Sequence, residues 1–104
     1  MSLRDLTLSL LSGIKDPRVR IDVSTTIYYL RDVYSTGRVS EEEIRESLYE
    51  VIETIIKVKE PDLLPEERKK KVERLVEQFM DAIKLETSRI RIQRVLRGRL
   101  MPPT

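Results

Sequence analysis

Residues 40–59, SEEEIRESLYEVIETIIKVK, decide the fold because they carry both a helix start and a helical apolar pattern. Ser40 followed three residues later by Glu43 forms a capping box. Three consecutive glutamates at this point favour the positive N-terminal end of a helix dipole. Apolar residues then recur at helical spacing in one stripe, which comprises Ile44, Leu48, Val51, Ile52, Ile55 and Val58. The pattern predicts a helix from about Glu41 to Lys59.

A second helix is predicted just before this one, from about Pro17 to Thr36. Asp16 suits its N-cap and proline its first position, while Gly37 suits a left-handed C-terminal stop. Its main apolar face comprises Val19, Val23, Ile27, Leu30 and Tyr34. Ile21 and Tyr28 lie nearly opposite that face. A helix that is apolar on two sides is either central in a bundle or in contact with a second chain.

Two further helices lie at the ends of the chain. A short one is predicted from about Leu3 to Gly13, and a long one begins near Glu66, after the loop bounded by Pro61 and Pro65. The long helix carries an apolar stripe of Val72, Leu75, Val76, Phe79, Ile83 and Ile90. The predicted core comprises Leu6, Leu10, Val23, Ile27, Leu30, Ile44, Leu48, Val51, Ile55, Val76, Phe79 and Ile83. The sequence therefore predicts an all-α, four-helix bundle-like single domain with a longer C-terminal helix.

The apolar stripe of the last helix changes sides near residue 90. In a straight helix, Arg91, Arg94 and Arg97 would continue the face that carries Phe79 and Ile83. Burial of unpaired charges is very costly. We therefore expect the helix to be kinked or broken near residue 88, or to leave the bundle so that a different partner covers its new apolar side. A strand is a third alternative, but it would have no mate in this chain.

The same change divides the chain into two regions. Residues 1–87 are predicted to form the helical bundle domain, and residues 88–104 a basic C-terminal helical extension with a frayed end. Residues 1–60 hold nine basic and eleven acidic groups, whereas residues 87–104 hold five arginines and no acid. The excess of positive over negative charge in the chain therefore comes from its last segment.

Composition argues against an enzyme. The chain has 104 residues, no histidine and no cysteine, which removes the usual general bases, thiol nucleophiles and zinc ligands. Its three isolated glycines form no phosphate-binding loop. We expect no catalytic residues, no cofactor and no metal site, and we interpret the row of Glu46, Glu50 and Glu53 as a solvated acidic face.

The same composition bears on the environment of the protein. The absence of cysteine favours a reducing cytoplasm, and no apolar run is long enough to span a membrane. Abundant charged residues, together with the absence of asparagine and cysteine, are typical of thermophilic proteins.

The arginines of the last segment, Arg89, Arg91, Arg94, Arg97 and Arg99, are the candidate contacts to nucleic acid or to an anionic partner. Three interpretations stay open. The apolar side of the segment packs on the bundle or on a sister chain while the arginines stay in water or pair with acids. Alternatively, the arginines contact nucleic-acid phosphates, because an acid-free arginine cluster is the electrostatic footprint of such proteins. The third interpretation is an acidic protein or weak contact with an anionic membrane surface.

A second set of candidate residues concerns oligomerisation. The off-face residues of the second helix and the apolar side of the last segment are the predicted contacts, namely Ile21, Tyr28, Ile92, Val95 and Leu96. They make a homodimer or another protein partner the expected association. The leading hypothesis is accordingly a small, non-enzymatic helical interaction or assembly protein. The alternative is an accessory nucleic-acid-binding protein that contacts phosphates through the C-terminal arginines.

Overall fold

Four helices account for the architecture, as the sequence predicts. They are α1 (Leu3–Leu10), α2 (Pro17–Ser35), α3 (Glu41–Lys59) and α4 (Pro65–Leu100). The structure, a computed structural model, describes the backbone of residues 1–100 and the side chains of residues 1–89. Over the backbone so described there is no strand, which confirms the all-α, four-helix bundle-like fold with a longer C-terminal helix.

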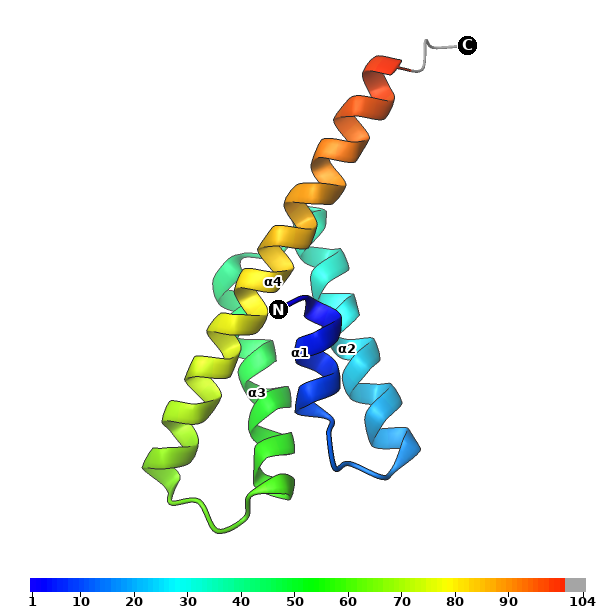
Figure 1. Cartoon of the computed structure of the whole chain (residues 1–104). Coiled ribbons are helices and arrows are strands. Elements are labelled where there is room, and N and C mark those ends of the chain that lie inside the picture. The colour runs from blue at the N-terminus through cyan, green and yellow to red at the C-terminus, as the bar shows by residue number, and fades with distance from the viewer. Residues whose placement is uncertain (101–104) are drawn as a thin grey trace.

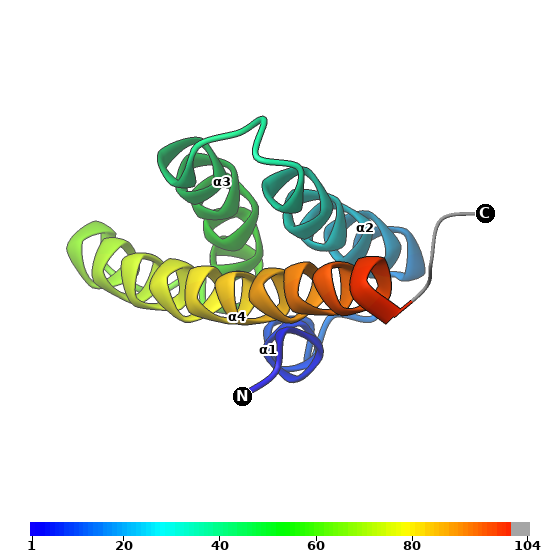
Figure 2. The same ribbon diagram turned by 90° about the horizontal axis from the view of Figure 1, so that it is seen from above.

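Helix α4 is the element around which the others are arranged. It crosses the bundle obliquely and continues beyond the other helices (Figure 1). Seen from above, α1 lies on one side of α4, while α2 and α3 lie on the other (Figure 2). Its apolar stripe therefore meets three helices, and its residues Val72, Phe79 and Ile83 are fully buried.

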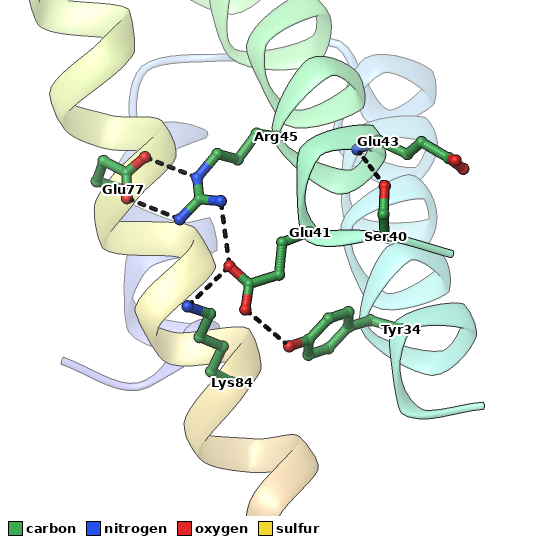
Figure 3. A network of polar contacts seen from close by, with 7 residues as sticks. All are labelled: Tyr34, Ser40, Glu41, Glu43, Arg45, Glu77 and Lys84. Carbon is green, nitrogen blue, oxygen red and sulfur yellow. Dashed lines mark hydrogen bonds and ion pairs between the residues drawn. The ribbon is translucent and has the colours of Figure 1, made fainter. Parts of the chain in front are cut away.

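Local signals set the helix starts. The backbone N–H of Arg18 donates to the Asp16 side chain at 2.9 Å, and that of Glu43 donates to the Ser40 hydroxyl at 3.2 Å. Both predicted N-caps are thereby confirmed. Only the Ser40 half of the capping box is formed, because the Glu43 carboxylate points away from Ser40 (Figure 3).

The short helix α1 is fixed at its C-terminal end by basic side chains from other helices. Arg20 donates to the carbonyl oxygens of Leu11 and Ile14 at 2.8 and 2.9 Å. Lys59 donates to the carbonyl oxygen of Leu10 at 2.9 Å. Cations at this end satisfy free carbonyls and oppose the negative end of the helix dipole. An eight-residue helix that is marginal alone is thus held by tertiary contacts.

The core is close to the one that the apolar pattern predicts. All the predicted core residues are buried except Val51, which is half-buried at the edge of a hollow between α2 and α3. Val58, included in the predicted stripe of α3, is 65% exposed, whereas Ile56, which lies off that stripe, is buried. In the last turn of α3, the buried apolar side chain is therefore Ile56, on the side of α3 that faces α1, and not Val58.

The break predicted near residue 88 is wrong, because α4 is a single helix through Leu100. From Glu66 to Arg97 it contains neither proline nor glycine, so nothing interrupts the backbone hydrogen-bond ladder. The helix instead leaves the bundle, which is the alternative that the sequence analysis gave beside a kink or break, and it does not fold back on it (Figure 1). The frayed end predicted for residues 100–104 lies, beyond Leu100, outside the residues that the structure describes.

Candidate interaction surface

The projecting part of α4, residues 88–100, is the feature that distinguishes this bundle, and we call it the α4 extension. The contacts that tie α4 to the bundle end just before it. Lys84 lies 2.9 Å from the Glu41 carboxylate, and Arg31 lies 3.1 Å from the Glu86 carboxylate. Thr87 is buried, and the next residues, Ser88 and Arg89, are exposed. The change from bundle to projection therefore occurs within one helical turn.

A charged network anchors α4 on the bundle side of this boundary (Figure 3). Arg45 forms a two-pronged contact with Glu77, with N–O distances of 2.8 and 3.3 Å, and lies 3.1 Å from Glu41. Glu41 also accepts a hydrogen bond from the Tyr34 hydroxyl at 3.3 Å and pairs with Lys84. Helices α2, α3 and α4 thus meet at one carboxylate.

This network shifts the ionisation of its members. The hydrogen bond from Lys84 lowers the pKa of Glu41 below its ordinary value, Arg45 and Tyr34 act in the same direction, and partial burial opposes them. The same hydrogen bond raises the pKa of Lys84. Because the charged forms of Glu41 and Lys84 are both favoured, this pair is an ion-pair anchor for α4.

The second anchor is Arg31 on α2. Its guanidinium contacts Asp32 and Glu86 at 3.1 Å and lies 4.9 Å from the centre of the Tyr28 ring. A cation over an aromatic face is attracted by the ring electrons. Tyr28, a predicted oligomer contact, is therefore half-buried beneath an arginine of its own helix.

The structure separates the predicted contact residues. Ile21 is 63% exposed near the start of α2, ten residues from Arg31, which is about 15 Å along a helix. The start of α2 is the end of that helix remote from the extension (Figure 1). Arg89 is exposed at the base of the extension. The other predicted contacts are in the extension, where their side chains lie outside the described residues: Arg91, Ile92, Arg94, Val95, Leu96, Arg97 and Arg99.

An apolar hollow beside the base of the extension was missed by the sequence analysis. It has a volume of about 340 Å³ and is lined by Met1, Leu6, Gln78, Asp81, Ala82 and Leu85. Met1 and Leu85 are 81% and 54% exposed. The available signal was Leu85, which lies off the bundle stripe of α4 and seven residues before Ile92, and therefore on the same helical face as Ile92.

Among the side chains of residues 1–89, no three potential ligands converge as a metal site would require. Glu46 and Glu50 are exposed, and Glu53 lies 3.5 Å from Lys57. Within the described residues, no helix has both the length and the apolar character that are needed to cross a bilayer.

Comparison with known proteins identified no relative of this chain. A scan of protein-family models, a search of curated proteins and a search of solved structures each found no match to the chain.

Proposed function

We propose that this protein is a small, non-enzymatic assembly protein, and that the α4 extension is the element through which it associates. One observation carries the proposal: α4 continues as an unbroken helix well past the last contacts of the bundle (Figure 1). A domain that needed α4 only for its core could end the helix near Thr87, the last residue described as buried.

The energetics of the extension support a partner. Its 13 residues, about 20 Å of helix, have no neighbouring element in the bundle (Figure 1). Isolated helices of this length are marginal in water, and most helical stability in proteins comes from packing of an amphipathic face. The sequence of the extension is amphipathic, with Ile92, Val95 and Leu96 on one side and arginines on the other. Association would bury the apolar side while the arginines stay in water.

Sedimentation velocity of two chains tests the proposal. The intact chain is expected to sediment as an oligomer, and a chain that ends at Arg89 as a monomer. This end point retains Thr87, which is buried in the bundle, and the circular dichroism and thermal midpoint of the short chain control for its folding. A monomer in both cases, at all concentrations tested, would defeat the proposal.

A second function is supported by the charge of the same segment. Residues 87–104 carry five arginines and no acid, and α4 projects beyond the other helices of the bundle (Figure 1). Phosphate contacts make nucleic-acid affinity fall steeply with salt, because bound counterions are released. Titration of DNA and RNA at two salt concentrations tests this function, and an Arg91→Glu, Arg94→Glu, Arg97→Glu variant should lose such binding while keeping its fold. An absence of binding at low salt would remove nucleic acid as a partner.

A further inference from the structure

We infer that the partner of the α4 extension is a second copy of this chain, and that the two α4 helices pair antiparallel along their outer faces. In this arrangement the extension of each copy covers the apolar hollow of the other. The inference rests on the proposed function and deepens it, because it names the partner, the receiving surface and the orientation.

The first argument is continuity of the apolar face. Leu85 lines the hollow and is 54% exposed. Ile92 follows it by seven residues and Leu96 by eleven, so in one unbroken helix all three fall within about 40° of one another. The hollow and the extension therefore occupy successive stretches of the same face of α4. A second copy that lies along this face can contact both stretches at once.

The second argument is the charge gradient along α4. Residues 73–86 carry four acids and two bases, whereas residues 87–100 carry five arginines and no acid. Glu77 and Glu86 already have arginine partners, but Asp81, at the rim of the hollow, is exposed and has no ion pair among the side chains described for residues 1–89. The receiving surface thus offers a carboxylate where the extension brings cations.

Charge then selects the orientation. Parallel pairing would set the whole arginine-rich extension of one copy against that of the other, and such like-charge proximity opposes association. Antiparallel pairing about a two-fold axis near residue 90 leaves only Arg89, next to the axis, close to its own copy, and places Arg99 beside Asp81 of the other chain. It also places Leu85 beside Val95 and Leu96 of the other chain. Because both copies use the same surface, the interface is self-complementary and closes as a dimer.

Cysteine cross-linking tests the orientation directly, since the natural chain has no cysteine to interfere. Full-length Leu85→Cys and Leu96→Cys variants are prepared, oxidised separately and then as a mixture. Disulfides require Cβ atoms about 3.5–4.5 Å apart, so the bond reports close approach. The mixture is expected to yield covalent dimer, and each variant alone should yield little. Val95→Cys replaces Leu96→Cys as a second variant if the latter weakens association.

A control separates specific contact from random collision. Val58 on α3 is 65% exposed and does not line the hollow, so a mixture of Val58→Cys and Leu96→Cys should cross-link no more than either variant alone. Efficient self-cross-linking of both Leu85→Cys and Leu96→Cys would overturn the antiparallel arrangement in favour of a parallel one.

A charge-swap series tests the receiving surface. Asp81→Arg is expected to weaken dimerisation at least tenfold in Kd, and mixing it with an Arg97→Glu, Arg99→Glu variant should restore most of the loss. Glu46→Arg is the control, because it makes the same charge change at an exposed position of α3 beside α4, away from the hollow. It should alter Kd less than twofold.

The outcomes distinguish this inference from the proposed function. If the intact chain associates through the extension, but neither the Leu85–Leu96 cross-link nor the Asp81 effect is found, the inference fails and the assembly proposal stands. If the intact chain is monomeric at every concentration, both fail.

Discussion

The two parts of α4, residues 65–87 and the extension, share one backbone helix but differ in what surrounds them. The first part packs its apolar stripe against three helices and is anchored by ion pairs to α2 and α3. The second part leaves the bundle without any interruption of the helix (Figure 1). The difference shows that helix continuity depends on the local backbone, whereas the face that is buried depends on which neighbours are present at each turn.

The largest expected effect comes from the core of the bundle part. Phe79 is fully buried, so Phe79→Ala should lower the free energy of unfolding by about 3–5 kcal/mol through lost burial and a new cavity. Leu85→Ala, at an exposed position six residues later on the same helix, should cost less than about 1 kcal/mol in dilute monomer. Urea unfolding followed by circular dichroism measures both. Equal losses would mean that the two positions are equally packed, contrary to the comparison.

A smaller effect of opposite sign is expected at the boundary. The Thr87 hydroxyl is buried and has no hydrogen-bond partner among the described side chains and backbone. Thr87→Val keeps the shape and removes the unsatisfied hydroxyl, so it should stabilise the fold by about 1 kcal/mol in the same urea measurement. A loss of stability would instead show that the hydroxyl is hydrogen-bonded in solution.

The Arg31 anchor should act more locally. Arg31→Met removes the contacts with Glu86 and the Tyr28 ring, and a partly exposed ion pair contributes at most about 1 kcal/mol to the global fold. Amide hydrogen exchange should nevertheless become faster around residues 84–89, because this turn loses its ion pair with α2. Arg18→Met, at an exposed position near the start of α2, is the matched control. Unchanged exchange in Arg31→Met would mean that packing alone fixes this end of α4.

The smallest effect concerns pH. The folded-state pKa of Glu41 lies below its ordinary value of 4.5, so the folded protein holds fewer protons there than the unfolded chain. Its contribution to stability is therefore present above that ordinary value and is lost as pH falls through the folded pKa. Thermal midpoints measured between neutral and acid pH should fall less steeply in Glu41→Gln than in the natural chain. Glu42→Gln, at a neighbouring exposed carboxylate that does not contact Lys84, should retain the natural slope.

Much of the fold could be predicted from local patterns. The bounds of α3 were predicted to the residue, because its cap, its acidic first turn and its apolar stripe all agree. The short α1 was predicted too long: it ends at Leu10, Gly13 adopts a positive φ of 85° beyond that end, and Arg20 and Lys59 bind the carbonyl groups there. These cations come from distant parts of the chain, so no local signal announces them.

The candidate surface was predicted less completely. The acid-free arginine cluster and the apolar side of the last segment are visible in the sequence, because they depend on helical spacing alone. The hollow is not visible, since Met1, which precedes α1, and Leu6 of α1 must be brought beside Ala82 and Leu85 of α4. The Glu41–Lys84 and Arg45–Glu77 pairs likewise depend on the packing register of α3 against α4.

The sequence by itself determined that the chain is helical, where most helices begin, and that the last helix changes its apolar face near residue 90. Those features follow from hydrogen bonds and side-chain spacing within a few residues. Only the tertiary structure decided how that change is accommodated: α4 continues unbroken and leaves the bundle. The physical reason is that no proline or glycine interrupts the backbone of α4 between Glu66 and Arg97, whereas the neighbours of a helix are chosen by the packing of the whole chain.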